Sequence, residues 1–366
     1  MKLVETREID QPAADPPGAP RRGASTRHVS REDLTALALF AITGLLIIAS
    51  GWISPSLGSW GQARAILVVS TFVMVVGFGQ QTVILTGGLD LSVPAVMTTG
   101  AVLLFSFVGG ASTALIWGVP LVLLITGSIG AVSGLFIALL RIPPFIMTLA
   151  MGIIVTGALL GISGGAPRGS VSPQLIRLFA GDWLGAPPII YVMACLTFLA
   201  LLWQRRTAFG RMLYAIGTSS DAAYIAGLPV KRVTILCYAI SGAAAGFAGV
   251  LIVGFSEGAS LYSGDDVLIP SIAAVVIGGT SILGGRGSYL GVVGGALLLA
   301  TFSTMITALG IPAGWRAIIY GTVILLALLT LQEDLHLWSK RLRSALGFHF
   351  LESVNKYLTH SERTAR

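Results

Sequence analysis

Ten long apolar runs dominate the sequence, and they constrain its fold more than any other feature. Each run is close in length to a membrane-spanning α-helix, which needs about twenty residues. The runs cover approximately residues 33–53, 64–86, 92–109, 112–140, 142–163, 187–203, 233–254, 266–283, 288–309 and 314–331. Only 11% of the residues are charged, against about a quarter in a soluble domain. Because the runs are continuous and not alternating, they predict an all-α polytopic membrane protein and disfavour a membrane β-barrel.

The basic residues predict how these ten helices are oriented. With a cytoplasmic N-terminus, only four of the 23 lysines and arginines lie outside, namely Arg64, Arg168, Arg177 and Arg316. This asymmetry follows the positive-inside rule, so both termini are expected in the cytoplasm. We therefore interpret the net charge of +7 as a topology signal and predict no nucleic-acid partner, since the chain has no compact basic module.

The chain divides into one large domain and two tails. Residues 1–32, which are rich in proline and charge, are predicted to be a disordered cytoplasmic tail. Residues 33–331 form the expected transmembrane domain, which contains a cytoplasmic loop at 204–232, and residues 332–366 form a C-terminal cytoplasmic tail. The longest external segment, 163–188, has enough apolar residues for a short surface helix, which we expect to be a platform for a partner.

Two pairs of similar segments indicate an inverted repeat. Asp90 and Asp266 each stand four residues before a proline at the start of a predicted span. In the same order, Pro143 and Pro312 each stand nine residues before a glycine. The ten-span topology places the members of each pair on opposite membrane surfaces, with Asp90 at the inner one and Asp266 at the outer one. Related units of opposite orientation are common in transporters, and here they comprise spans two to five and seven to ten.

Asp90 has two interpretations. Asp and Ser suit a helix N-cap and Pro94 suits the first turn, so Asp90 or Ser92 is expected to cap the third span at the membrane boundary. Alternatively, Asp90 lines a solute path, because ionisable groups in membrane segments are often functional.

The loop 204–232 is the longest predicted internal connection. Its segment SSDAAYIAG has the signature of a short helix with a polar cap and a glycine stop. Such a helix is suited to a groove on a cytosolic partner, with an ordinary connector as the alternative. The candidate coupling residues are Gly210, Arg211, Ser219, Asp221, Ala222, Ala223, Ala226 and Gly227.

Four blocks of sequence resemble one transporter family. GGLDLSV, GRMLYAIGTSSDAAYIAGLPVKRV, SGAAAGFAGVL and GGTSILGGRGSYLGVVGGALLL occur in this order within residues 60–330. Together they are similar to the ribose-type permeases of bacterial ABC importers, which are related to the branched-chain amino-acid permeases. Pro94, where a glycine is common, and Ser219-Ser220, where an asparagine is frequent, depart from the usual pattern.

The resemblance implies a multi-pass subunit of the bacterial plasma (inner) membrane, surrounded by membrane lipid. Its expected partners are cytosolic ABC ATPase subunits, a second permease copy in a homodimer, an extracytoplasmic substrate-binding protein and a monosaccharide substrate. A sugar path needs neutral hydrogen-bonding groups, and its candidate residues, besides Asp90, are Gln80, Gln81, Thr82, Thr98, Thr99, Ser303, Thr304 and Thr307. The equal alternative for this set is hydrogen bonding between helices.

No motif indicates an enzyme. The sequence has no G-x-x-x-x-G-K-[ST] phosphate loop, and its four histidines all fall in the tails, so we expect no catalytic residue, no metal and no cofactor. Glycines four apart are expected to allow close helix packing instead, in the pairs Gly242 and Gly246, Gly291 and Gly295, and Gly157 and Gly161. Two alternative functions remain: an ion-coupled secondary transporter, or an ABC permease for a nucleoside or an amino acid.

Overall fold

The computed structural model describes residues 31–53, 57–312 and 314–331, which are almost entirely helical. The predicted tails at 1–32 and 332–366 lie outside these residues, except for Arg31 and Glu32, which begin α1. The helices are α1 (Arg31–Ile53), α2 (Trp60–Leu85), α3 (Val93–Val102), its π-helical continuation η1 (Leu103–Val108), α4 (Ala114–Leu140), α5 (Pro144–Ser163), α6 (Pro173–Ala180), α7 (Pro188–Arg206), α8 (Ala208–Thr218), α9 (Ser220–Ile225), α10 (Val230–Ser256), the short 3₁₀ turn η2 (Asp265–Val267), α11 (Leu268–Ile277), α12 (Tyr289–Ala308) and α13 (Gly314–Leu331).

Every predicted apolar run forms a helix, but the helices differ in length. Within the described part of the chain, seven helices are long and apolar enough to cross a membrane: α1, α2, α4, α5, α7, α10 and α12. Two of the other predicted spans are shorter, because α3 with η1 covers Val93–Val108 and α11 has only 10 residues. The structure therefore establishes a multi-pass helical protein, and the count of ten crossings stays a prediction.

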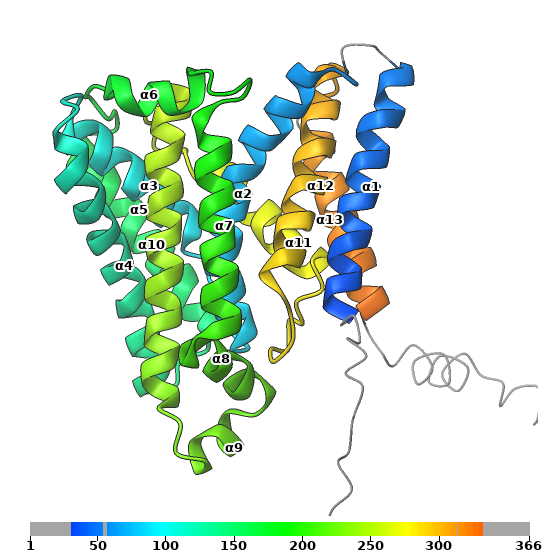
Figure 1. Ribbon diagram of the computed structural model, residues 1–366. Helices are drawn as coiled ribbons and strands as arrows, with labels where there is room; N and C mark the ends of the chain where they lie inside the picture. Colours follow the sequence, from blue (N-terminus) through cyan, green and yellow to red (C-terminus); the bar gives the residue numbers. More distant parts are fainter. Residues whose placement is uncertain (1–30, 54–56, 313, 332–366) are drawn as a thin grey trace, which may run out of the picture.

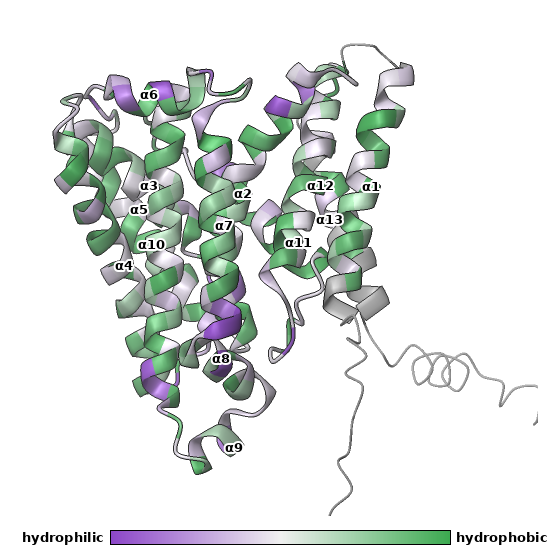
Figure 2. Ribbon diagram, in the orientation of Figure 1, coloured by the Kyte–Doolittle hydropathy of each residue, from purple (hydrophilic) through white to green (hydrophobic). Residues whose placement is uncertain are grey.

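Two long helices organise the packing. α10 packs against α2, α3 and α4, while α12 packs against α1, α2 and α11. In Figure 1, α3, α4, α5 and α10 lie on one side of α2, and α1 with α11, α12 and α13 lies on the other. Figure 2 shows that the long helices are mostly apolar along their length, with hydrophilic residues gathered near the end of α7 and around α8. We call the end of the molecule that carries α8 and α9 the basic end, because Arg205, Arg206 and Arg211 lie there.

Glycines allow the closest of these helix contacts. A Cβ atom added to Gly242 would collide with the Thr126 carbonyl oxygen of α4, and one added to Gly295 would lie 3.0 Å from the Ala274 Cα of α11. The two predicted pairs on α10 and α12 are therefore confirmed as packing glycines. Among the described residues, no atom lies within 4 Å of a Cβ added to Gly157 or Gly161, so the close packing predicted for this pair does not occur within this part of the chain.

Two extended connectors return from the ends of long helices to the middle of the protein. The first, residues 86–92, brings Asp90 to Ser241, which lies near the middle of α10. At 1.5 Å per residue, Ser241 is about 16 Å from the start of α10 and about 22 Å from its end. Asp90 is therefore buried inside the helical bundle beside the middle of α10, whereas the sequence predicted a position at the membrane boundary.

The second connector, residues 257–267, leaves the end of α10 that lies opposite the basic end. Its Gly264 N–H donates a 3.1 Å hydrogen bond to the Thr98 hydroxyl of α3. A Cβ added to Gly264 would also collide with Pro94, in the first turn of α3. This connector therefore packs against the first two turns of α3, and α11 begins directly after it. Asp266, just before α11, is exposed in this chain.

Candidate functional site

The Asp90 carboxylate is the centre of a buried polar cluster. Asp90 is 1% exposed. One carboxylate oxygen accepts hydrogen bonds from the Ser92 N–H at 3.0 Å and the Ser92 hydroxyl at 2.6 Å. The other accepts a 2.7 Å bond from the Ser241 hydroxyl. The residue at the cap position of α3 is Ser92, and its side chain makes no capping bond. Asp90 therefore does not cap α3; it holds the start of that helix against α10.

The backbone around Asp90 is held from two further helices. The Gln80 amide of α2 donates a 2.6 Å bond to the Asp90 carbonyl oxygen. Thr148 of α5 accepts from the Leu91 N–H at 3.0 Å and donates to the Leu89 carbonyl oxygen at 3.3 Å. The connector 86–92 is thus fixed by α2, α5 and α10 together, which is what a backbone segment without regular structure requires at membrane depth.

A second polar cluster joins α2, α7 and α12. Gln81 donates to the Thr280 hydroxyl at 3.2 Å and accepts from the Gln204 amide at 3.3 Å. The side-chain amide oxygen of Gln204 accepts a 2.9 Å hydrogen bond from the Tyr289 N–H at the start of α12. Sequence reasoning missed Gln204 and Thr280, because Gln204 follows the apolar run 187–203 and precedes two arginines, so it looks like the first residue of the basic loop.

The remaining candidate path residues are spread over several helices. Thr82 is buried and donates to the Gly79 carbonyl oxygen, and Thr99 donates to the Ala95 carbonyl oxygen within its own helix. On α12, Thr304 and Thr307 bond back to carbonyl oxygens one turn earlier, whereas Ser303 is half-buried. The set does not form one lining surface. Gln81 and Thr98 bond to other elements, as the alternative of hydrogen bonding between helices expects, whereas Thr99, Thr304 and Thr307 bond within their own helices.

The connector 257–267 instead exposes charge beside the start of α11. Asp265 and Asp266 are both exposed, and Tyr262 is 77% exposed. Within the described residues, neither carboxylate makes an ion pair. A charged side chain that faces the hydrocarbon core of a bilayer raises the free energy of insertion by several kcal/mol, roughly 2.5–3.5 on insertion scales. This surface is therefore suited to water or to another protein surface, and not to hydrocarbon.

The short helix predicted in the loop 204–232 is α9. The Ser219 hydroxyl caps it by accepting from the Ala222 N–H at 3.2 Å. Gly227 follows with a positive φ of 83°, a conformation that favours glycine. Gly210, in α8, packs against the Gln204 backbone, while Arg211 and Asp221 are exposed.

The side chains that α9 presents differ from those expected. Ala223 is buried against this chain's own core together with Leu213 and Val233, so it faces inward, contrary to the expectation that it enters a partner. Ala222 and Ala226 are exposed. The large exposed side chains are Tyr224 at 71% and Ile225 at 85%, which sequence reasoning passed over in favour of the alanines.

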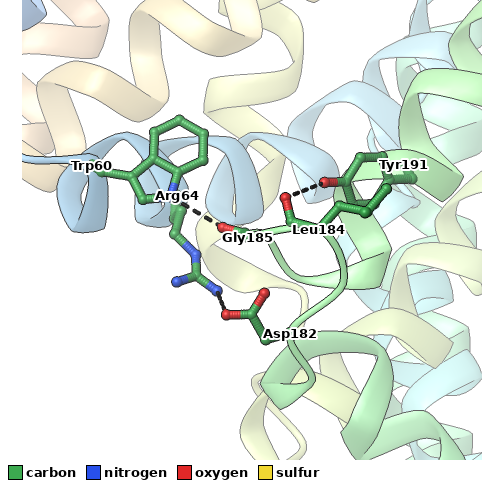
Figure 3. A network of polar contacts seen from close by, with 6 residues as sticks. All are labelled: Trp60, Arg64, Asp182, Leu184, Gly185 and Tyr191. Atoms are coloured by element: carbon green, nitrogen blue, oxygen red, sulfur yellow. Dashed lines mark hydrogen bonds and ion pairs between the residues drawn. The ribbon is translucent and has the colours of Figure 1, made fainter.

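The end of the molecule opposite the basic end carries a further polar network (Figure 3). Arg64 of α2 pairs with Asp182 at 3.4 Å, and the Trp60 indole donates to the Gly185 carbonyl oxygen at 3.0 Å. The surface helix expected in 163–188 is α6, but its Leu175 and Phe179 are buried beneath it against α10. The side chains of Leu175 and Phe179 thus complete the fold and are not available to a partner, whereas Trp183 of the same segment is 65% exposed, so docking at this segment stays a prediction.

Comparison with known proteins gives a consistent result. The family described as "Branched-chain amino acid transport system / permease component" matches residues 62–328. The ribose import permease of Escherichia coli K12 is 31% identical over 296 residues, which is 80% of this chain and 92% of that protein. The fructose import permease of Rhizobium meliloti is 35% identical over 272 residues, 72% of this chain and 75% of that protein.

Another relative is a probable ABC transporter permease of Sinorhizobium fredii, 32% identical over 327 residues, 88% of this chain and 95% of that protein. No solved structure matches. The family match spans α2 to α13, including both connectors and α9. The chain is therefore a multi-pass inner-membrane protein that belongs to the family of ABC-importer permease components.

Proposed function

We propose that this permease component moves a monosaccharide across the bacterial inner membrane and is driven by separate ATPase subunits. The observation that carries the proposal is its similarity, over most of the chain, to permeases for ribose, fructose and D-allose. In this assignment the chain has no catalytic residue of its own. An ion-coupled mechanism is not favoured, because the relatives are ABC permeases.

The packing supports an inverted repeat as the basis of alternating access. α2 packs against α11 and α12, and α10 packs correspondingly against α3 and α4. α3 and α11 are both 10 residues long, with a proline in the first turn. Each follows a connector that returns to the middle of the protein. If α2–α5 and α10–α13 are two related units, each unit supports the short helix of the other, as in inverted-repeat transporters. Cytoplasmic termini complete this topology.

The solute path follows the second connector in this proposal. Asp265, Asp266 and Tyr262 are exposed there, and carboxylates and phenols suit the hydroxyl groups of a sugar as hydrogen-bond partners. A second permease copy would close the opposite wall and keep lipid away from the two carboxylates. The cluster around Asp90 then serves as the rigid support of the path, next to Thr98 and Gly264.

The ATPase contact is the exposed face of α9. Tyr224 and Ile225 offer apolar surface at the basic end. Because α9 joins α8 to α10, a movement of α9 would be transmitted both to the α7–α8 segment and to α10. The external binding protein delivers the sugar at the other end.

Transport by the assembled complex tests the proposal. The permease, its ATPase and its binding protein would be reconstituted in liposomes and offered a panel of labelled monosaccharides, a nucleoside and a branched-chain amino acid. ATP-dependent uptake of one or more monosaccharides is expected. Uptake of only the nucleoside or only the amino acid would contradict the sugar assignment while leaving the family assignment intact.

A further inference from the structure

The loop between α11 and α12, residues 278–288, is fixed to the basic end. The Gly285 N–H donates a 3.0 Å hydrogen bond to the Leu85 carbonyl oxygen at the end of α2. The Tyr214 hydroxyl of α8 donates a 2.7 Å bond to the Gly287 carbonyl oxygen. The loop is therefore attached to two other elements that are distant in sequence.

Glycines make this attachment close. A Cβ added to Gly217 of α8 would lie 3.0 Å from the Gly285 Cα, and one added to Gly285 would lie 2.8 Å from the Thr218 hydroxyl. Thr218 directly precedes Ser219, the cap of α9. The loop thus lies against the junction between α8 and α9, and both features occur at the same end of the molecule in Figure 1.

The tip of the loop presents apolar surface. The Ser281 N–H bonds to the Arg286 carbonyl oxygen and the Gly284 N–H to the Ser281 carbonyl oxygen, each at 3.0 Å. These bonds close a turn that leaves Leu283 88% exposed and Ile282 41% exposed. A single exposed leucine needs no explanation. Here, however, Leu283 stands two residues before Gly285, which packs against Thr218 at the junction of α8 and α9.

We propose that the loop tip at 281–287 is a second docking element for the ATPase, with Leu283 as its apolar anchor. The inference rests on the proposed function, because the occupant is the same partner that α9 contacts. The attachment of the loop to α8 and to the α8–α9 junction, through Gly287 and Gly285, favours this partner over lipid. The loop ends directly in α11 and α12, so an ATPase movement would reach the second unit through it while α9 carries the movement to α10. One ATPase subunit would then act on two elements of the permease.

Serine substitutions in the full complex test the proposal. Leu283→Ser is expected to weaken ATPase retention by about tenfold, a change of 1.4 kcal/mol, and to reduce the sugar transported per ATP hydrolysed. Ile225→Ser provides the comparison on α9. Leu184→Ser is the matched control, because Leu184 is 94% exposed at the opposite end and its change should leave ATPase retention unaltered. The thermal unfolding temperature of each purified variant would exclude misfolding.

A photo-crosslinking residue at position 283 gives a second readout. Crosslinks to the ATPase are expected, and crosslinks to lipid alone would overturn the proposal. If Leu283→Ser retains ATPase and couples normally while Ile225→Ser does not, the loop is not a docking element and the proposed function stands. If neither variant has an effect, both proposed ATPase contacts are wrong.

Discussion

Ser241 and Asp90 are 151 positions apart, and the Ser241 hydroxyl donates a 2.7 Å hydrogen bond to the Asp90 carboxylate. This bond fastens the start of the short helix α3 to the middle of the longest central helix. This bond explains why an aspartate stands between two apolar stretches. A helix that begins inside the bundle needs polar groups to hold the backbone that precedes it, since lipid supplies no hydrogen-bond partners.

Asp90→Ala should destabilise the permease by about 1–3 kcal/mol, because Ser92 and Ser241 would lose their buried acceptor. Asp90→Asn should cost less, since its amide oxygen still accepts from Ser92 and the Ser241 hydroxyl can accept from the amide nitrogen. Thermal unfolding of the detergent-solubilised permease would measure both. The exposed control Asp182→Ala should change stability by less than about 1 kcal/mol. Full transport with equal stability in all three variants would contradict this role.

Gly242→Ala and Gly157→Ala compare two helical glycines that sequence reasoning treated alike. Both substitutions gain the same intrinsic helix preference, about 1 kcal/mol. Only the first adds a methyl group where the Thr126 carbonyl oxygen already lies, an overpacking that typically costs about 1–3 kcal/mol. The thermal unfolding temperature should therefore fall for Gly242→Ala and stay unchanged or rise for Gly157→Ala. The reverse order would show that the α4–α10 contact is not as close as described.

Ala226→Trp and Ala223→Trp separate the two faces of α9. Ala226 is exposed and Ala223 is 5% exposed against the chain's own core. Ala226→Trp should leave the permease stable but lower ATPase co-purification, because packed interfaces tolerate added volume poorly. Ala223→Trp should lower thermal stability even without the ATPase. Unchanged stability in Ala223→Trp would mean that α9 does not sit on this core.

Asp266→Cys tests whether the second connector faces water. In a Cys195→Ser background, a membrane-impermeant thiol reagent should label this cysteine in the assembled complex, and excess transported sugar should slow the labelling. The native Cys237 is 0% exposed and supplies the unreactive comparison in the same chain. If position 266 reacts no faster than Cys237, the path does not run along this connector.

The positions of the helices and the family could be predicted from the sequence, whereas the length of α11 and the burial of Asp90 could not. The run 266–283 is apolar enough to resemble a span, yet α11 is only 10 residues long, because Gly279 adopts a positive φ of 84° and ends the helix just after Gly278. Asp90 looked like a boundary residue because capping aspartates are common at helix starts. Its carboxylate is held by Ser241 and the neighbouring backbone by Thr148, two partners distant in sequence that no local pattern indicates.

The direction of the α9 side chains was also beyond the sequence. The alanines suggested a close-fitting face, but a helix of 6 residues has too few positions for periodicity to define which side is buried. The core contacts of Leu213 and Val233 determine that Ala223 faces inward, and they leave Tyr224 and Ile225 for a partner.

The most direct test of the account is the energy source of sugar uptake by the reconstituted complex. We predict that labelled monosaccharide accumulates when ATP is present on the ATPase side. We also predict that uptake stops with a non-hydrolysable ATP analogue and is unchanged by ionophores that collapse proton and sodium gradients. Uptake by the permease alone that follows an imposed ion gradient, without the ATPase or ATP, would contradict the account.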